Sequence, residues 1–236
     1  MTDAEILGLF EKTEFPEFLG EDNVEDFIEN KTHFPETFKF TWNTGASKLV
    51  ILPFDTDFVI KIPFNGQYLE RREMDYETGE IILEENGWEP FTSEEYDSEN
   101  MDFDGNYCGR EADISDIATA EDLEECFAIT ECVGRCGDYL IYNQARATTI
   151  LADVLDEKSD SLSLEERKSI RDKCNNMGVY GFNIYWLKDF LEFFGEEILK
   201  QLDRFINTYG INDLHTSNVG YIGNRPVLID YSGYFE

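Results

Sequence analysis

Three oxygen-bearing side chains near the end of the chain have a spacing that suits phosphate chemistry. Asp213 and Asn218 lie five residues apart, and Asp230 follows after a short apolar run. The glycine–asparagine turn at 223–224 predicts a small hairpin that folds Asp230 back towards Asn218. An amide oxygen and a carboxylate close together suit Mg²⁺, which prefers oxygen ligands and shares them with substrate phosphates. Asp213 would then be free to take a proton from a hydroxyl group, although each residue taken singly also suits a loop cap, a turn or a strand end.

Lys61 is the second candidate, because it stands inside the apolar segment FVIKIPF, residues 58–64. A lysine in such a strand can turn its ammonium outward at a sheet edge. If it lies in a cleft instead, it needs a carboxylate partner to keep its charge.

The pattern of predicted strands and helices indicates an α+β protein, with a sheet in the first half of the chain and helices in the second. Apolar residues at three- and four-residue steps predict a long helix over 187–209, bent at Gly195 and ended by Gly210. The segment 68–88 has features of a further helix, weakened by two glycines. Strands are predicted at 38–42, 48–54, 58–64, 126–134 and 138–144, and capping boxes predict helices over about 3–12 and from 163 to 178.

Together these residues resemble the protein-kinase-like superfamily. Asp213-x-x-x-x-Asn218, then an apolar strand and Asp230-Tyr231-Ser232-Gly233, is similar to the family's catalytic loop and metal-binding DFG segment. The wording NDLHTSN is closest to the GDLHxxN form of aminoglycoside and choline kinases, and Val-Ile-Lys61 stands where the family has V-A-I-K. The resemblance covers most of the chain from about residue 38, with motif-level identity only at Lys61 and residues 213–233.

The resemblance implies a two-lobed protein-kinase-like fold with an antiparallel five-stranded N-lobe and a short helical C-lobe. Only YSGYFE follows Asp230, so we expect no activation segment and a reduced C-lobe, and Asn212 stands where protein kinases have an arginine. The expected organisation is an N-terminal helical extension at 1–37, an N-lobe at 38–144 with an acidic insertion at about 89–106 and an αC-type helix at about 107–125, a hinge at 145–149, and the C-lobe at 150–236.

The resemblance also implies an ATP site and a role for each residue. Lys61 would contact the α and β phosphates, Asn218 and Asp230 would hold Mg²⁺, and Asp213 would orient and deprotonate an acceptor hydroxyl. The implied reaction is transfer of the γ-phosphoryl group, with serine or threonine of a protein narrowly favoured over a small molecule. The resemblance further implies a carboxylate partner for Lys61: Glu111 is preferred, because it begins the predicted helix directly before the fourth strand, and Glu77 or Glu80 is the alternative. The remaining implied contacts are the turn Thr44, Gly45, Ala46 and Ser47 over the phosphates, and Gln144, Ala145 and Ala147 at the adenine hinge.

The composition restricts the partners of the protein. A formal net charge of −32 over 236 residues repels nucleic acid phosphates and favours a protein partner with a basic surface. The alternative function is therefore a catalytically silent acidic interaction protein, for example a nucleic acid mimic, on a kinase-like scaffold. No apolar run is long enough for a membrane span and the N-terminus is acidic, so we expect no membrane association and a cytoplasmic location.

The cysteine and acid patterns leave one metal hypothesis besides magnesium. Five cysteines without a CxxC pair and only two histidines give little support for zinc. Asn100, Asp102, Asp104, Gly105 and Glu111 fit the twelve-residue EF-hand calcium loop, except that Asn replaces the usual first Asp. Such matches arise by chance in acid-rich segments, so calcium stays the weaker assignment for Glu111.

Overall fold

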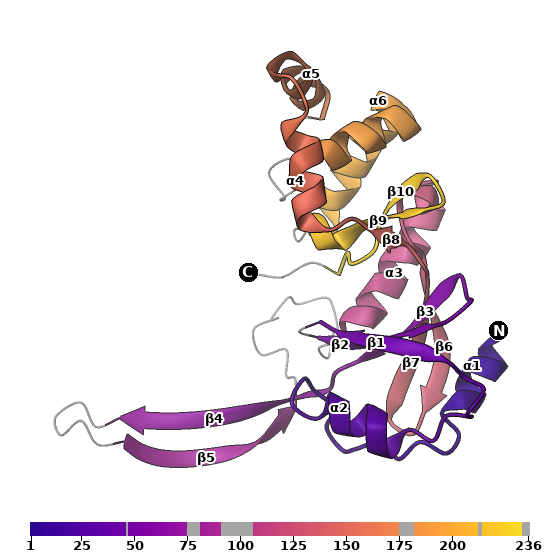
Figure 1. The fold of residues 1–236 in the computed structure, drawn as a ribbon, viewed down its shortest axis with the longest axis vertical. Helices are drawn as coiled ribbons and strands as arrows, with labels where there is room; N and C mark the ends of the chain where they lie inside the picture. The colour runs from indigo at the N-terminus through magenta and orange to yellow at the C-terminus, as the bar shows by residue number, and fades with distance from the viewer. Residues whose placement is uncertain (46, 75–80, 91–105, 175–181, 212–213, 233–236) are drawn as a thin grey trace. The chain divides into compact units, whose positions relative to one another are not determined.

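The computed structural model describes residues 1–45, 47–74, 81–90, 106–174, 182–211 and 214–232 (Figure 1). The chain divides into two compact units. The first consists of Met1–Asp55, Val59–Gly109 and Cys132–Asn143, and the second of Thr56–Phe58, Arg110–Glu131 and Gln144–Glu236. Most of the predicted acidic insertion falls outside the described residues. No helix among the described residues is both long and apolar enough to span a bilayer.

The five-stranded antiparallel sheet expected from the sequence is present, and all five strands lie within a few residues of their predicted positions. The strands are β1 (Phe40–Thr44), β2 (Lys48–Pro53), β3 (Phe58–Pro63), β6 (Thr130–Cys136) and β7 (Tyr139–Ala145). Their spatial order is β1-β2-β3-β7-β6, so β3 is the central strand. Leu49, Ile51, Ile60 and Ile62 are fully buried and give the sheet its apolar core.

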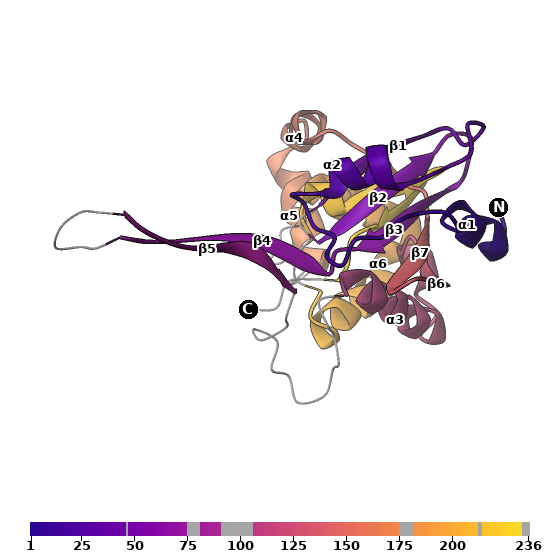
Figure 2. The same ribbon diagram turned by 90° about the horizontal axis from the view of Figure 1, so that it is seen from below.

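The prediction of a helix in the segment 68–88 is wrong, because β4 (Gly66–Met74) and β5 (Ile81–Pro90) form a hairpin there. The hairpin is a separate two-stranded ribbon that extends away from the five-stranded sheet (Figure 2). Tyr68 lies opposite Trp88, with ring centroids 5.7 Å apart, and Trp88 also stacks on Phe18 at 6.5 Å. These contacts join residues twenty or more positions apart, so a helical pattern read over a short window does not register them.

The N-terminal segment packs within the first unit. Helix α1 (Asp3–Leu9) starts at the predicted capping box, where Glu5 N–H donates to Thr2 Oγ1 and Thr2 N–H donates to Glu5 Oε2. After α2 (Val24–Asp26) the chain makes a π-helical turn (Phe27–Lys31). The ring of Phe15 stacks on Tyr139 of β7, with centroids 4.7 Å apart, which fixes the segment against the sheet.

The second unit is built around a long bent helix. Helix α6 (Ile184–Thr208) is bent at Gly195, whose φ of 82° lies outside the helical range, as the sequence predicted. Its neighbours are α3 (Tyr107–Ala120), which continues from the first unit, a 3₁₀ turn (Glu124–Cys126), α4 (Ala152–Asp160) and α5 (Leu164–Cys174). A three-stranded sheet in the order β10-β9-β8 completes the unit, from β8 (Thr148–Thr149), β9 (Val219–Ile222) and β10 (Arg225–Leu228).

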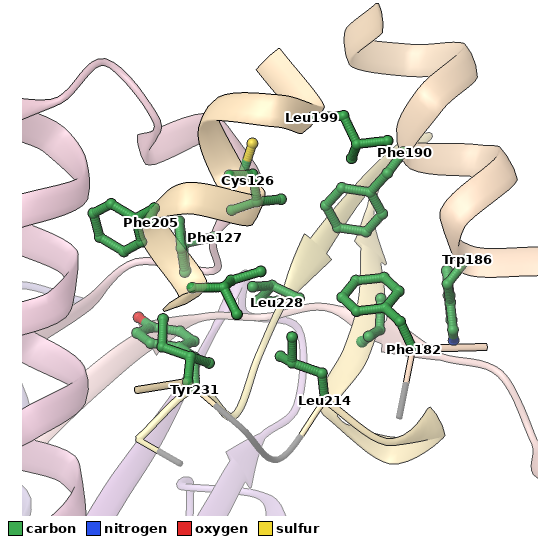
Figure 3. Close-up of a cluster of buried hydrophobic side chains, with 14 of the residues drawn as sticks. Cys126, Phe127, Phe182, Trp186, Phe190, Leu199, Phe205, Leu214, Leu228 and Tyr231 are labelled. Atoms are coloured by element: carbon green, nitrogen blue, oxygen red, sulfur yellow. The ribbon is translucent and has the colours of Figure 1, made fainter. Parts of the chain in front are cut away.

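The core of the second unit joins the end of the chain to these helices. Phe127 packs edge-on against Tyr231, with ring centroids 5.0 Å apart, and against Phe205 of α6 at 5.5 Å (Figure 3). The same core holds the buried side chains Leu214 and Leu228, which precede and follow the hairpin turn. The C-terminal segment that carries the candidate site is therefore anchored by apolar burial.

Candidate functional site

The β9–β10 hairpin, predicted from the turn at 223–224, folds the segment that carries Asp230 back towards Asn218. Its register pairs Val219 with Leu228, and one step further Ile229 N–H donates to Asn218 O at 2.9 Å. Asn218 thus lies opposite the residue that precedes Asp230. Asn218 is 6 % exposed and Asp230 is half-buried.

The predicted catalytic loop follows directly from the end of α6. Gly210 has a φ of +62°, and Ile211 N–H donates to Ile206 O at 3.0 Å, which is the Schellman arrangement that ends a helix at glycine. Ile211 and Leu214 are both buried in the core. Residues 212–213, and with them Asp213, lie outside the described residues, but their two neighbours in the chain have fixed positions.

Glu111 lies on α3 in the second unit and belongs to a group of buried polar side chains. Asn106 caps the start of α3, because its Oδ1 accepts the Gly109 N–H at 2.9 Å. Glu111 and Ser115 are four residues apart on this helix and therefore share one face. The buried polar cluster consists of Glu111, Ser115, Thr130, Gln144 and Tyr231, each at most 3 % exposed.

Hydrogen bonds connect all members of the buried polar cluster. Thr130 Oγ1 donates to Glu111 Oε2 at 3.2 Å, and Gln144 Nε2 donates to Thr130 Oγ1 at 2.8 Å and to Ile229 O at 2.9 Å. The Tyr231 hydroxyl lies 2.7 Å from Ser115 Oγ and 3.1 Å from Thr130 Oγ1. A buried carboxylate loses its hydration, and these hydrogen bonds offset part of the free-energy cost of burying Glu111.

Two of the residues predicted for the adenine hinge, Gln144 and Ala147, contact the β9–β10 hairpin or the residue that follows it. The side-chain amide of Gln144 belongs to the buried polar cluster, and Ala145 N–H donates to Ile129 O at 3.1 Å. Ala147 packs against Gly220 of β9, where an added Cβ would lie 3.1 Å from the Ala147 Cβ and 3.0 Å from Thr148 O. Glycine at 220 therefore permits the close approach of this segment to the hairpin.

Lys61 and the predicted phosphate-covering turn belong to the first unit. Lys61 is 4 % exposed on the central strand β3, so the edge-strand interpretation of this lysine is wrong. In the turn between β1 and β2, Gly45 N–H donates to Lys48 O at 3.1 Å. Thr44 and Ser47 are half-buried, and Ala46 lies outside the described residues.

The structure also bears on the other metal and partner hypotheses. Residues 100–105 of the calcium loop and the alternative partners Glu77 and Glu80 lie outside the described residues. The carboxylate of Glu111 accepts hydrogen bonds from Thr130 and Gln144 in the interior. Where side chains are described, no group of three histidine, cysteine or acidic residues could hold a metal. The predicted Mg²⁺ ligands Asn218 and Asp230 carry the oxygen donors that this ion prefers, and Mg²⁺ commonly takes few protein ligands because it keeps several waters and phosphate oxygens.

Sequence reasoning missed Ser115, Thr130 and Tyr231. Tyr231 carried a usable signal, because a tyrosine next to a candidate metal ligand in an apolar context needs a partner for its hydroxyl. Burial and the nearby Glu111 carboxylate raise the pKa of Tyr231, so its hydroxyl stays neutral. Ser115 and Thr130 have no local signal, since they act through partners distant in the chain.

Comparison with protein-family models, with curated proteins and with solved structures finds no match to this chain.

Proposed function

We propose that the protein is an ATP- and Mg²⁺-dependent phosphotransferase of the protein-kinase-like superfamily, which transfers the γ-phosphoryl group to a hydroxyl. Protein serine or threonine is slightly favoured over a small molecule as the acceptor. The observation that carries the proposal is the backbone bond from Ile229 N–H to Asn218 O, which pairs Asn218 with the residue directly before Asp230. Asn218 and Asp230 are the two predicted magnesium ligands.

The arrangement of elements supports the same proposal. Three strands of the five-stranded sheet and then the β4–β5 hairpin precede α3, the other two strands of that sheet follow it, and a linker leads to the helices and then to the loop before β9. This is the chain order of the resemblance, with Lys61 on the third strand of the sheet and Glu111 near the start of the helix. A lysine and a glutamate that are both buried are the residue types expected for a phosphate contact and its supporting carboxylate.

In the proposed reaction, Asp213 accepts the proton of the acceptor hydroxyl as its oxygen attacks the γ phosphorus. The bond between that phosphorus and the β–γ bridging oxygen breaks, and ADP leaves with the electron pair. Lys61 would orient the α and β phosphates through its positive charge, and Asn218 and Asp230 would hold the metal. Bound Mg²⁺ would neutralise part of the phosphate charge. Ile211 and Leu214, which flank residues 212–213 in the chain, are buried in the core.

Nucleotide binding and transfer can be tested separately on the purified protein. Mg·ATP at a hundredfold excess over its dissociation constant should add about 2.7 kcal/mol to the free energy of unfolding, read as a rise in the melting temperature. Labelled ATP should give a phosphorylated product with the protein itself, a basic protein or small hydroxyl compounds as acceptor. Asp213→Asn should abolish transfer and keep the thermal shift, because the loss concerns proton transfer and not nucleotide binding.

The matched control is Asp156→Asn, an acid-to-amide change at an exposed position of α4, which should change neither the shift nor the transfer. Unchanged transfer in Asp213→Asn would refute the role of this residue. A protein without thermal shift and without labelled product would refute the phosphotransferase proposal and favour the silent acidic interaction protein.

A further inference from the structure

We propose that Tyr231 is a positioning residue whose buried hydroxyl holds Asp230 and Glu111 in one common arrangement. The inference rests on the proposed function, because it concerns how the metal-binding segment and its supporting helix are kept together. Tyr231 touches neither the acceptor nor the nucleotide in this proposal and acts through its two partners.

The Tyr231 hydroxyl joins the segment after β10 to three other elements. It lies 2.7 Å from Ser115 Oγ on α3, and it donates to Ala128 O at 2.9 Å, in the segment before β6. It is also 3.1 Å from Thr130 Oγ1 on β6. Figure 3 shows this hydroxyl oxygen turned away from the aliphatic side chains of the core and towards α3.

The backbone on both sides of Asp230 is fixed by the same set of residues. On one side, Ile229 O accepts from Gln144 Nε2 at 2.9 Å, and Ile229 N–H donates to Asn218 O at 2.9 Å. On the other side, Tyr231 is held through its hydroxyl. Asp230 is therefore the half-buried residue between two anchored neighbours.

Glu111 is connected to the same hydroxyl by two routes. Ser115 Oγ lies within bonding distance of Glu111 O, at 2.9 Å, as well as of the Tyr231 hydroxyl, and Thr130 N–H donates to Ser115 Oγ at 3.0 Å. Thr130 Oγ1 in turn donates to the Glu111 carboxylate. Movement of α3 relative to the segment 229–231 would therefore break several buried hydrogen bonds at once, which makes one arrangement strongly preferred.

The hydroxyl, and not the ring, carries this role. The ring of Tyr231 packs on Phe127, with centroids 5.0 Å apart, and a phenylalanine ring can make the same contact. A fully buried hydroxyl stabilises the protein only when its bonds are made, because it gives up its hydration. A change of Tyr231 to phenylalanine removes the hydroxyl oxygen and keeps the ring contact, so it tests the positioning role of the hydroxyl without a loss of ring packing.

The test uses Tyr231→Phe in the full-length protein, with Tyr209→Phe as the matched control. The Tyr209 hydroxyl donates to the exposed Glu121 Oε1 at 3.0 Å and lies outside the buried polar cluster. Hydrogen exchange without nucleotide should become about tenfold faster in Tyr231→Phe, the change that corresponds to about 1.4 kcal/mol, near the upper value for a buried neutral hydrogen bond. The increase should occur together in the segment 229–232 and in α3 from Glu111 onward, and be absent in Tyr209→Phe.

A second readout links positioning to function. In Tyr231→Phe the Mg²⁺ concentration that gives half-maximal phosphoryl transfer from ATP should rise about tenfold, because a smaller fraction of the protein has the arrangement that binds the metal. Ser115→Ala provides an independent variant if Tyr231→Phe does not fold. It should show the same two effects, and the double variant should show little more than either single one, since both changes remove the same bond.

The outcomes separate the two proposals. If exchange in the two segments is unchanged in both variants, or changes in only one segment, the positioning role is refuted whatever the activity. If the segments loosen together while the Mg²⁺ dependence of transfer stays at the wild-type value, Tyr231 is only structural and the proposal is also refuted. If the wild-type protein neither binds Mg·ATP nor transfers phosphate, the proposed function fails and the role falls with it, although the hydrogen-exchange coupling persists.

Discussion

Lys61 and Glu111 are both buried, and their predicted pairing can be tested by a double-mutant cycle. Lys61 is 4 % exposed on β3 and Glu111 is fully buried on α3. The variants are Lys61→Met, Glu111→Gln and the double variant, which remove each charge with a side chain of similar length. The quantity to measure is the free energy of unfolding in urea, followed by tryptophan fluorescence at pH 7.

The burial of both residues sets the expected magnitude. Removal of one partner from a buried ion pair leaves an uncompensated charge and costs about 3–5 kcal/mol. If the two residues pair, the double variant removes both charges and should be destabilised by about as much as one single variant. The coupling free energy is then about 3 kcal/mol or more. Thr130 and Gln144 bond the Glu111 carboxylate and will lower the cost of the lysine change towards the smaller value.

An exposed pair calibrates the cycle. Lys188 and Glu192 lie one helical turn apart on α6 with a nitrogen–oxygen distance of 3.0 Å, and Glu192 is well exposed. A cycle on this pair should give only about 0.3–0.5 kcal/mol, the usual value for exposed helix pairs. If the Lys61 and Glu111 changes are additive within about 0.5 kcal/mol, the two residues do not pair, and the assignment of Glu111 as the lysine partner is refuted.

Two further predictions concern the backbone and the pH dependence of stability. Gly210→Ala should destabilise the protein by about 1 kcal/mol, because the left-handed φ of +62° disfavours a Cβ. The control is Gly8→Ala inside α1, where an added Cβ meets open space, so this change should be neutral or stabilising. Equal losses of unfolding free energy in urea for the two variants would contradict this prediction. Burial raises the pKa of Tyr139 from 10.0 to about 12, so the stability gained from its neutral hydroxyl is complete below pH 10 and is lost as the pH rises towards 12. The stability difference between wild type and Tyr139→Phe should therefore narrow between pH 10 and 12, and a constant difference in urea midpoints would show that the hydroxyl does not titrate as described.

Part of the candidate site follows from local sequence signals. Gly210 predicts the end of α6, and the turn at 223–224 predicts the hairpin that returns Asp230 to Asn218. Both signals act through backbone geometry over a few residues, so they hold whatever the remainder of the chain does. The backbone hairpin between the two predicted metal ligands is therefore structure that the sequence indicates directly.

Other parts of the site depend on residues far apart in the chain. The bond of Gln144 with Ile229 O and the bond of Tyr231 with Ser115 join residues more than eighty positions apart. No local pattern encodes such pairs, because a serine or a glutamine is equally suited to an exposed position until the surrounding core removes its water. The same holds for the β4–β5 hairpin, where Tyr68 and Trp88 meet across two strands.

The sequence by itself determined the helix and strand positions that rest on periodicity, capping and turns, and it determined which residue types are suited to phosphate chemistry. The tertiary structure decided that Lys61 lies buried on a central strand and that Glu111, Thr130, Gln144 and Tyr231 share one hydrogen-bonded cluster. The physical reason is that local backbone preferences act within a few residues. Burial and buried hydrogen bonds arise only when distant segments pack together and exclude water.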